Sequence, residues 1–237
     1  MYYPPYGYSR SDNLMENVNT TGNQNSNLNM LKNENMISYI RLLHAAPKAP
    51  SVDVYVNGRL LVKKFNYREF TDYFKLPSGT YNIKVFATGN TTEPVIETDL
   101  FVPPKEVITV AVIKDTNNDF LLYPAVETPL KNAPPGKSRV RVAHFISNAP
   151  SVDIALPNGT ILYKDVEFKD LEKYIEVPPG KYTFEVRLAG TDIPILYIPN
   201  IRLRPDRYYT VYAIGLIGDD PSPQVLIPLD GITYIDV

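Results

Sequence analysis

Hydrophobic and polar residues alternate along most of the chain from Ser38 onward. Val52, Val54 and Val56 alternate with more polar neighbours, and the same alternation returns near residues 80–87. A period of two places successive side chains on opposite faces of a strand, so this pattern predicts half-buried β-strands. Turn residues interrupt it about every eight to twelve residues, which is typical of an all-β sandwich.

The alternation predicts a series of strands in the first half of the chain, and the second half repeats them. The expected strands lie near residues 38–45, 52–57, 59–63, 70–75, 80–87, 95–102, 107–113 and 120–123. Helix signals are nearly absent. Residues 168–174 could form one or two helical turns, but the matching segment 67–73 favours a β assignment for both.

The chain contains a long internal repeat. Residues 41–54 return as residues 141–154, and both copies carry R-x-x-H, an Ala-Pro pair and Ser-Val-Asp. Each repeat is long enough to close its own hydrophobic core, so the pattern indicates a domain duplication and not a solenoid. We therefore predict two tandem antiparallel, immunoglobulin-like β-sandwich domains, at residues 38–125 and 138–237.

Two segments lie outside the predicted sandwiches. Residues 126–137 are rich in proline, which favours an extended, semi-rigid linker and a restricted angle between the domains. Residues 1–37 begin with Tyr, Pro and Gly and continue as an Asn-rich stretch with few apolar side chains. Such a composition cannot bury enough apolar surface to offset its ordering entropy. We expect a disordered arm, or one that orders only on meeting a partner.

Composition and charge argue against several classes of protein. The net charge is −2 and no stripe of Lys and Arg occurs, so the footprint of a nucleic-acid-binding protein is missing. No apolar run has the length of a membrane span, and the first residues lack the pattern of a secretory signal. The chain has no cysteine, which excludes disulfides, zinc-thiolate sites and thiol nucleophiles.

The two histidines of the chain, His44 and His144, are each followed nine residues later by an aspartate, Asp53 and Asp153. A His/Asp pair near a serine can support nucleophilic catalysis. A duplicated structural motif would also keep these residues, because a histidine at a strand end can bond a loop backbone. We favour this structural role, with Asp53 accepting backbone N–H bonds from the following turn or an adjacent strand. Ligand or metal contact is the alternative, although one imidazole per repeat is too few for a zinc site.

Residues 115–119 match the first half of a calcium-binding loop, with oxygen-bearing side chains at alternate positions. Phe120 follows where the calcium loop requires glycine, and Val126 occupies the position of the closing glutamate. We therefore predict a polar hairpin turn. No cofactor, metal or catalytic group is expected, and we expect that the protein is not an enzyme.

Tyrosine is common in this chain, with 18 residues, and four tyrosines lie in the N-terminal segment. Tyr2, Tyr3, Tyr6 and Tyr8 have no core to join, so we expect exposed aromatic side chains. They could contact a neighbouring subunit or a glycan, or take part in oxidative cross-linking. The alternative is a leader without a function of its own.

The string R-x-x-H, the Ala-Pro pair and V-D-V-Y-V-N-G resemble the hallmark of a bacterial and archaeal family known as domain of unknown function 4397. Both repeats carry the match from about Ser38 to the C-terminus. In the first repeat it rests on Arg41, His44, Pro50, Val52, Asp53, Val54, Tyr55, Asn57 and Gly58. In the second it rests on Arg141, His144, Pro150, Val152, Asp153, Asn158 and Gly159. The resemblance implies tandem immunoglobulin-like or transthyretin-like sandwiches on exported, surface-associated proteins, and no established activity.

These observations favour a non-catalytic structural or assembly protein of a bacterial surface, self-associating through its N-terminal arm and sheet edges. A start without a recognisable signal and rich in Tyr, Pro and Gly is similar to proteins that spore-forming bacteria deposit on the spore from the mother cell. We therefore expect a spore outer layer or an appendage, with a homo-oligomer or other surface-layer proteins as partners. The alternative is a surface module that binds a glycan or a protein without self-assembly, and a hydrolase comes third.

Overall fold

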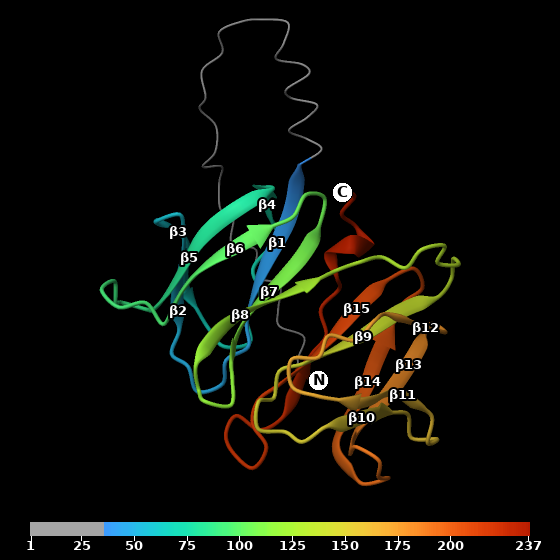
Figure 1. Cartoon of the computed structure of the whole chain (residues 1–237). Helices are drawn as coiled ribbons and strands as arrows, with labels where there is room; N and C mark the ends of the chain where they lie inside the picture. Colours follow the sequence, from blue (N-terminus) through green and yellow to red (C-terminus); the bar gives the residue numbers. More distant parts are fainter. Residues whose placement is uncertain (1–35) are drawn as a thin grey trace, which may run out of the picture.

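A computed structural model of the chain describes residues 36–237, which form two β-sandwiches, one from each repeat (Figure 1). The first sandwich consists of sheet A, with the strand order β4-β1-β7-β8, and sheet B, with the order β3-β2-β5-β6. Its strands are β1 (Ile37–His44), β2 (Val52–Val56), β3 (Arg59–Phe65), β4 (Phe74–Pro77), β5 (Gly79–Ala87), β6 (Ile96–Val102), β7 (Val107–Lys114) and β8 (Phe120–Val126).

The second sandwich repeats this arrangement. Sheet C has the order β12-β9-β15-β16 and sheet D the order β11-β10-β13-β14. Its elements are β9 (Ser138–His144), β10 (Val152–Ala155), β11 (Ile161–Val166), β12 (Ile175–Val177), β13 (Gly180–Leu188), β14 (Pro194–Leu203), β15 (Tyr208–Ile214), β16 (Gln224–Leu226) and the short 3-10 helix η1 (Gly231–Thr233). The expected all-β fold with two sandwich domains is confirmed. Within residues 36–237 no helix is long and apolar enough to span a membrane.

Most of the predicted N-terminal arm, with Tyr2, Tyr3, Tyr6 and Tyr8, lies outside the described residues. The first described strand begins at Ile37 and pairs with β4 on one side and β7 on the other.

The sheets are antiparallel with one exception in each sandwich. β1 pairs with β7 in parallel, and β9 pairs with β15 in the same way. A parallel pair needs a long crossover connection. Here the chain leaves sheet A after β1 for β2 and β3 of sheet B, returns to sheet A as β4, crosses again to sheet B for β5 and β6, and comes back as β7. The alternation of apolar and polar residues did not predict this parallel pair. It indicates which side chains lie on the same face of a strand, but not the direction of the neighbouring strand.

The apolar positions of the alternating strands fill the interior of each sandwich. In the first, Ile40 and Leu42 of β1 meet Val54 of β2 and Val85 of β5 between the sheets. The second interior has the same construction. The hairpin between β2 and β3 turns at Asn57 and Gly58, whose φ angles of 48° and 76° are those that an Asn-Gly hairpin turn requires.

One predicted strand is wrong over part of its length. We expected β structure over residues 67–73 and a strand near 70–75. The first repeat instead has a turn at residues 67–68, a single bridge between Leu43 and Phe70 and no strand at residues 71–73, and β4 begins only at Phe74. Arg68 has a φ of 76°, which breaks the strand, and the Glu69 carboxylate accepts the N–H of Asn66 at 2.7 Å. The matching segment 168–174 is likewise neither helix nor strand.

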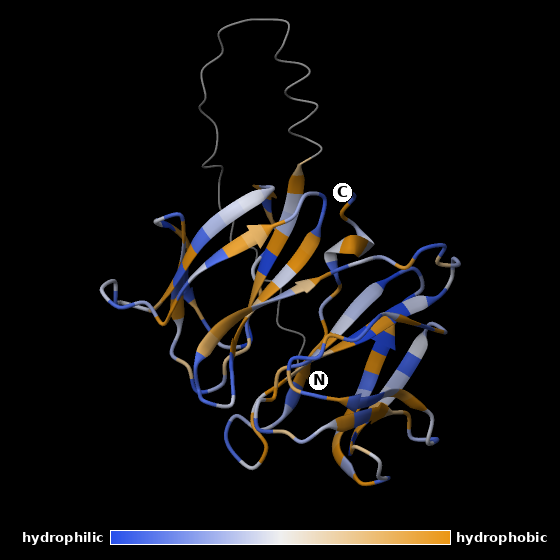
Figure 2. Cartoon of the chain, in the orientation of Figure 1, coloured by the Kyte–Doolittle hydropathy of each residue, from blue (hydrophilic) through white to orange (hydrophobic). Residues whose placement is uncertain are grey.

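The central strands of sheets A and C are buried on both faces, whereas the edge strands of all four sheets are partly exposed. Every residue of β9 and β15 is buried, and so are all residues of β7 except the last. Their outward faces form one apolar cluster, so the two sandwiches pack through these sheets in the order B, A, C, D. Hydrophobic residues line the strands that meet there, whereas the outer loops are hydrophilic (Figure 2).

Candidate functional site

His44 and His144 lie buried at the ends of β1 and β9. Nε2 of His44 is 3.3 Å from the carbonyl oxygen of Pro50, and Nδ1 of His144 accepts the backbone N–H of Ile146 at 3.2 Å. Burial lowers the pKa of both histidines, that of His144 to about 4. Both rings are therefore neutral at pH 7 and bond the turn that follows their strand.

Asp53 and Asp153 bond the neighbouring edge strand. Oδ1 of Asp53 accepts the N–H of Lys64 at 2.7 Å and the hydroxyl of Thr88 at 3.0 Å. Asp153 accepts the N–H of Asp165 at 2.8 Å in the same way. Lys64 and Asp165 have φ angles of 52° and 54° at irregularities of the strand pairing. Each carboxylate thus holds the amide of a β-bulge.

The histidine and aspartate of each repeat make separate contacts. His44 bonds the turn at Pro50, whereas Asp53 bonds β3 and the start of the turn after β5. Burial alone would raise the pKa of Asp53, but the hydrogen bonds from Lys64 and Thr88 bring it below its usual value. The histidine and the aspartate therefore stabilise different parts of the sandwich, and their contacts do not combine them into one catalytic or binding site.

The loop that resembles a calcium site is a hairpin turn between β7 and β8. Oδ1 of Asp115 accepts the N–H groups of Asn117 and Asp119 at 2.8 and 3.0 Å, and Asn118 has a φ of 66°. These bonds direct the carboxylate of Asp115 to the loop's own backbone. Among residues 36–237 no three His, Cys, Asp or Glu side chains form a group that could hold a metal ion.

The most developed polar arrangement lies where the sandwiches meet, and we call it the junction. Arg41 reaches from sheet A into the second sandwich. Its Nε donates to Oγ1 of Thr109 at 2.7 Å within its own sheet. Its Nη1 donates to the carbonyl of Leu229 and its Nη2 to Oδ1 of Asp230, both at 3.0 Å. Arg41 is 4% exposed, so these contacts are shielded from water.

Arg141 makes the reciprocal contacts from the second sandwich. Its Nε donates to Oγ1 of Thr210 at 2.9 Å, and its Nη1 donates to the carbonyl of Val126 at 2.6 Å. Val126 and Leu229 occupy equivalent places, since each pairs with the same position of the central strand. The two arginines are therefore related by a local twofold arrangement.

Two carboxylates and two tyrosines complete the junction. Glu127 accepts the hydroxyl of Tyr73 at 2.6 Å, and Asp230 accepts the hydroxyl of Tyr174 at 2.7 Å. The Thr109 and Thr210 hydroxyls also donate to these acids, at 2.9 and 2.7 Å. Each arginine lies over its tyrosine ring, Arg41 at 4.9 Å from Tyr73 and Arg141 at 4.4 Å from Tyr174.

The four charges of the junction balance, but they are not distributed evenly. Arg41 lies 3.0 Å from Asp230 and 3.5 Å from Glu127, whereas Nη2 of Arg141 is buried without a partner. Burial, and next the Asp230 carboxylate, raise the pKa of Glu127, and Arg41 opposes this shift. Removal of one partner from a buried ion pair destabilises the fold, because the other charge stays buried without compensation. Arg41 contacts both carboxylates, so it is the central group of the junction.

The C-terminal segment closes the junction over the first sandwich. Gly231 donates its N–H to the Tyr73 hydroxyl at 3.0 Å. A Cβ atom at Gly231 would lie 2.7 Å from the Tyr73 ring and 2.8 Å from a methyl group of Val107. The close approach of η1 to sheet A therefore requires glycine at this position.

The apolar part of the junction combines large and small side chains. Phe145 and Tyr212 of the second repeat correspond to Ala45 and Ala111 of the first, and all four are buried. The Phe145 ring lies 5.1 Å from that of Tyr123 in the first sandwich. Two copies of the second repeat's face would bring two sets of large rings together, so this surface fits the first repeat better than it fits itself.

The sequence motif contained Arg41 and Arg141, but their role at the junction was not predicted. One signal was present: residues 107–113 and 208–214 are nearly continuous apolar and aromatic runs, interrupted by Thr109 and Thr210. A strand without alternation is typical of burial on both faces. Two such runs at equivalent positions could have indicated a covered outer face.

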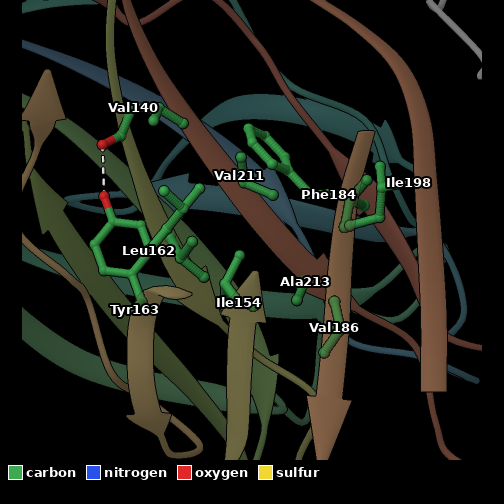
Figure 3. Close-up of a pocket in the computed structure, with 11 residues that line it drawn as sticks. Val140, Ile154, Leu162, Tyr163, Phe184, Val186, Ile198, Val211 and Ala213 are labelled. Carbon is green, nitrogen blue, oxygen red and sulfur yellow. Dashed lines mark hydrogen bonds between the residues drawn. The ribbon is translucent and has the colours of Figure 1, made fainter. Parts of the chain in front are cut away.

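The sandwich interiors leave little free space. The cavity in the second sandwich is about 10 Å³, roughly the space of one water molecule, and only apolar side chains and Tyr163 line it. The Tyr163 hydroxyl points out of this cavity to the carbonyl of Val140, at 2.6 Å (Figure 3). This cavity has no room for a ligand larger than water, and the cavity inside the first sandwich is about 30 Å³.

The fold and the junction define a protein of two fused β-sandwich repeats. The model of the family described as Domain of unknown function (DUF4397) matches residues 38–155 and 155–230, and the chain belongs to this family. The resemblance carried by the repeated motifs is thereby confirmed. The matched segments meet at the end of β10 and not between the sandwiches. A search of curated proteins found no match to this chain.

Proposed function

We propose that this chain is a non-catalytic structural protein of a bacterial surface, which self-associates through its N-terminal segment and sheet edges. The observation that carries the proposal is the junction. It joins the two sandwiches into one unit through buried faces and directs sheets B and D outward. A fused unit with two outward sheets suits a building block, because its contact surfaces keep a fixed spacing.

The strand edges support assembly as the mode of action. Among residues 36–237, sheets B and D end at β3, β6, β11 and β14, each of which pairs with a strand on one side only. Free N–H and C=O groups on an edge can accept an added segment from another chain. The 35 residues before Met36 supply such a segment, with a reach of about 115 Å at about 3.3 Å per residue.

The proposal includes a place, the outer layer of a spore or an appendage. What supports this is the Tyr-, Pro- and Gly-rich composition of the first residues, together with the surface association that the family resemblance implies. Synthesis in the mother cell before deposition is part of the same proposal.

Deletion of residues 1–35 tests the assembly. We expect the full chain to form multimers, measured by light scattering after gel filtration and by electron microscopy, and the shortened chain to remain a monomer. Equal thermal unfolding of both chains is the control that the sandwiches are intact. If the two chains have the same mass and the same assemblies, the proposal fails.

A binding module for a glycan or a protein is the second candidate. Two aromatic side chains on outer strands favour it, Phe101 of β6 at 63% exposure and Tyr197 of β14 at 58%. Aromatic rings on a sheet surface can stack on sugar faces. Binding of the monomeric protein to a glycan array, lost in Tyr197→Ala, would support this candidate over assembly.

A further inference from the structure

Sheets B and D have the same strand order but different chemistry on equivalent edge strands. On β6, Glu97 lies opposite Lys84 and forms an ion pair with it at 2.7 Å. At the equivalent position of β14, Tyr197 lies opposite Glu185. The turn before the strand also carries a charged side chain in the first repeat and an apolar one in the second, since Glu93 corresponds to Ile193. The second repeat thus has an apolar surface where the first has a charged one.

Ile193, Ile195 and Tyr197 form what we call the β14 patch. They are 60%, 44% and 58% exposed. Tyr197 lies opposite Glu185 of β13, Ile195 lies at a register shift in the pairing of β14 with β13, and Ile193 directly precedes the strand. β14 is the outermost strand of sheet D. Large apolar side chains that cluster on an exposed edge mark an interaction surface, whereas single ones do not.

A charged rim borders the β14 patch. Arg187 of β13 donates to Glu185 at 2.7 Å and to Asp192 at 2.9 Å. The Asp192 side chain is 99% exposed, so its carboxylate remains open to a further cation. The surface therefore combines three apolar side chains with an accessible negative group at the start of β14.

The backbone of β14 decides which kind of partner fits. Pro194 and Pro199 lie in this strand and have no N–H group to donate. They interrupt the edge, so extension of sheet D by β14 of a second copy would lack a continuous hydrogen-bond ladder. The partner should bind mainly through side chains, as Pro-rich segments do on surfaces with aromatic residues.

We infer that the β14 patch binds residues 1–10 of a second copy of this chain. Residues 1–9 contain four tyrosines and two prolines and no charged side chain, which fits the apolar surface. Arg10 follows at once and matches the open carboxylate of Asp192. The inference rests on the proposed function, and it adds the acceptor surface on the neighbouring molecule.

Photo-crosslinking in the full chain tests this pairing. With p-benzoylphenylalanine in place of Tyr6, we expect crosslinks between chains that map to residues 192–199. The same group in place of Tyr55, on sheet B, is the control and should not mark β14. Crosslinks that map to another surface, or within one chain, would overturn the inference.

A pair of substitutions separates this inference from the proposed function. Ile193→Glu with Tyr197→Glu gives the second repeat the side chains of the first, and we expect at least about tenfold weaker self-association. Phe101→Glu, with an equally exposed ring on β6, should leave self-association unchanged. If deletion of residues 1–35 abolishes the multimer but the double variant keeps it, the acceptor is wrong and the proposed function stands. If neither change affects the multimer, the proposed function fails as well.

Discussion

The junction faces and the outer faces of the two repeats differ in how far the repeats resemble each other. At the junction, each of Arg41 and Arg141 donates to a threonine of its own sheet and to a backbone carbonyl of the other sandwich, and only Arg41 also pairs with a carboxylate. On the outer sheets, Glu97 of one repeat corresponds to Tyr197 of the other. The repeats therefore share the polar contacts of the junction, although Phe145 and Tyr212 correspond to Ala45 and Ala111 there, and they differ in charge where they face outward.

This difference follows from packing. A local twofold contact needs a matching donor and acceptor on both sides, because an unpaired charge in a dry interface is costly. The outer faces of sheets B and D pack against no other sheet within the described part of the chain. They can carry charge on one sheet and an apolar patch on the other without loss of the fold, which frees them for contacts with other molecules.

We expect the largest loss of stability from a substitution that breaks the junction. Arg41→Met removes the cation between Asp230 and Glu127 and leaves both acids buried, so we expect unfolding to be easier by about 3–5 kcal/mol. Denaturant unfolding measures this change. Arg202→Met, which removes an exposed arginine from β14 of sheet D, is the matched control and should shift the midpoint much less. Equal shifts in both variants would erase the distinction between the two regions.

The next effect concerns pH and the buried histidines beside the junction. His144 has its pKa lowered from 6.5 to about 4, so below pH 6.5 the unfolded chain binds a proton that the folded chain does not. The contribution of neutral His144 to the free energy of unfolding is fully present above pH 6.5. It is lost as the pH falls from 6.5 toward 4, and the total loss is about 3 kcal/mol. The raised pKa of Glu127 acts with the opposite sign.

The histidine contribution is isolated by comparison with His144→Asn, whose amide oxygen can still accept the N–H of Ile146. We expect the variant to lose less stability than the wild type between pH 6.5 and 4, as followed by thermal melts. Parallel pH profiles in the two proteins would show that His144 does not titrate in this way.

Both repeats share one contact within their outer sheets, the hydrogen bond from the motif aspartate to a backbone amide of the neighbouring edge strand. Asp53→Ala leaves the amide of Lys64 and the hydroxyl of Thr88 without their acceptor, and we expect a loss of about 1–3 kcal/mol. Asp153→Ala should cost a similar amount through Asp165. Asp99→Ala on exposed β6 is the control. An unchanged melting temperature in Asp53→Ala would contradict the scaffold role, and together with the loss of a bound ligand it would assign this residue to ligand binding.

The smallest expected effect lies on the outer faces. Tyr197→Glu places the side chain of the first repeat on β14, and we expect a change in stability within about 0.5 kcal/mol, because the ring is largely exposed. Chemical unfolding measures it. A loss as large as that of Asp53→Ala would mean that Tyr197 belongs to the core and that the outer faces are not free to vary.

The sequence predicted those features that depend on local patterns. Alternation around Val52–Val56 and the Asn57-Gly58 turn indicated strands and hairpins, and the repeat indicated two domains. The structure adds what depends on distant partners: the parallel pairing of β1 with β7 and the meeting of Arg41 with Asp230, which is 189 residues away. The β structure expected near Phe70 is wrong for a local reason, the left-handed backbone at Arg68. The sequence did not predict it, because position 68 is neither glycine nor asparagine, the residues that favour this conformation.

The junction joins the two sandwiches into one unit that unfolds cooperatively, and calorimetric unfolding of the whole chain measures this cooperativity. A single transition, with a calorimetric enthalpy equal to the van't Hoff enthalpy, is the result we predict for the wild type. In Arg41→Met the transition should broaden or separate into two. Two independent transitions in the wild-type chain, unchanged by Arg41→Met, would contradict the claim.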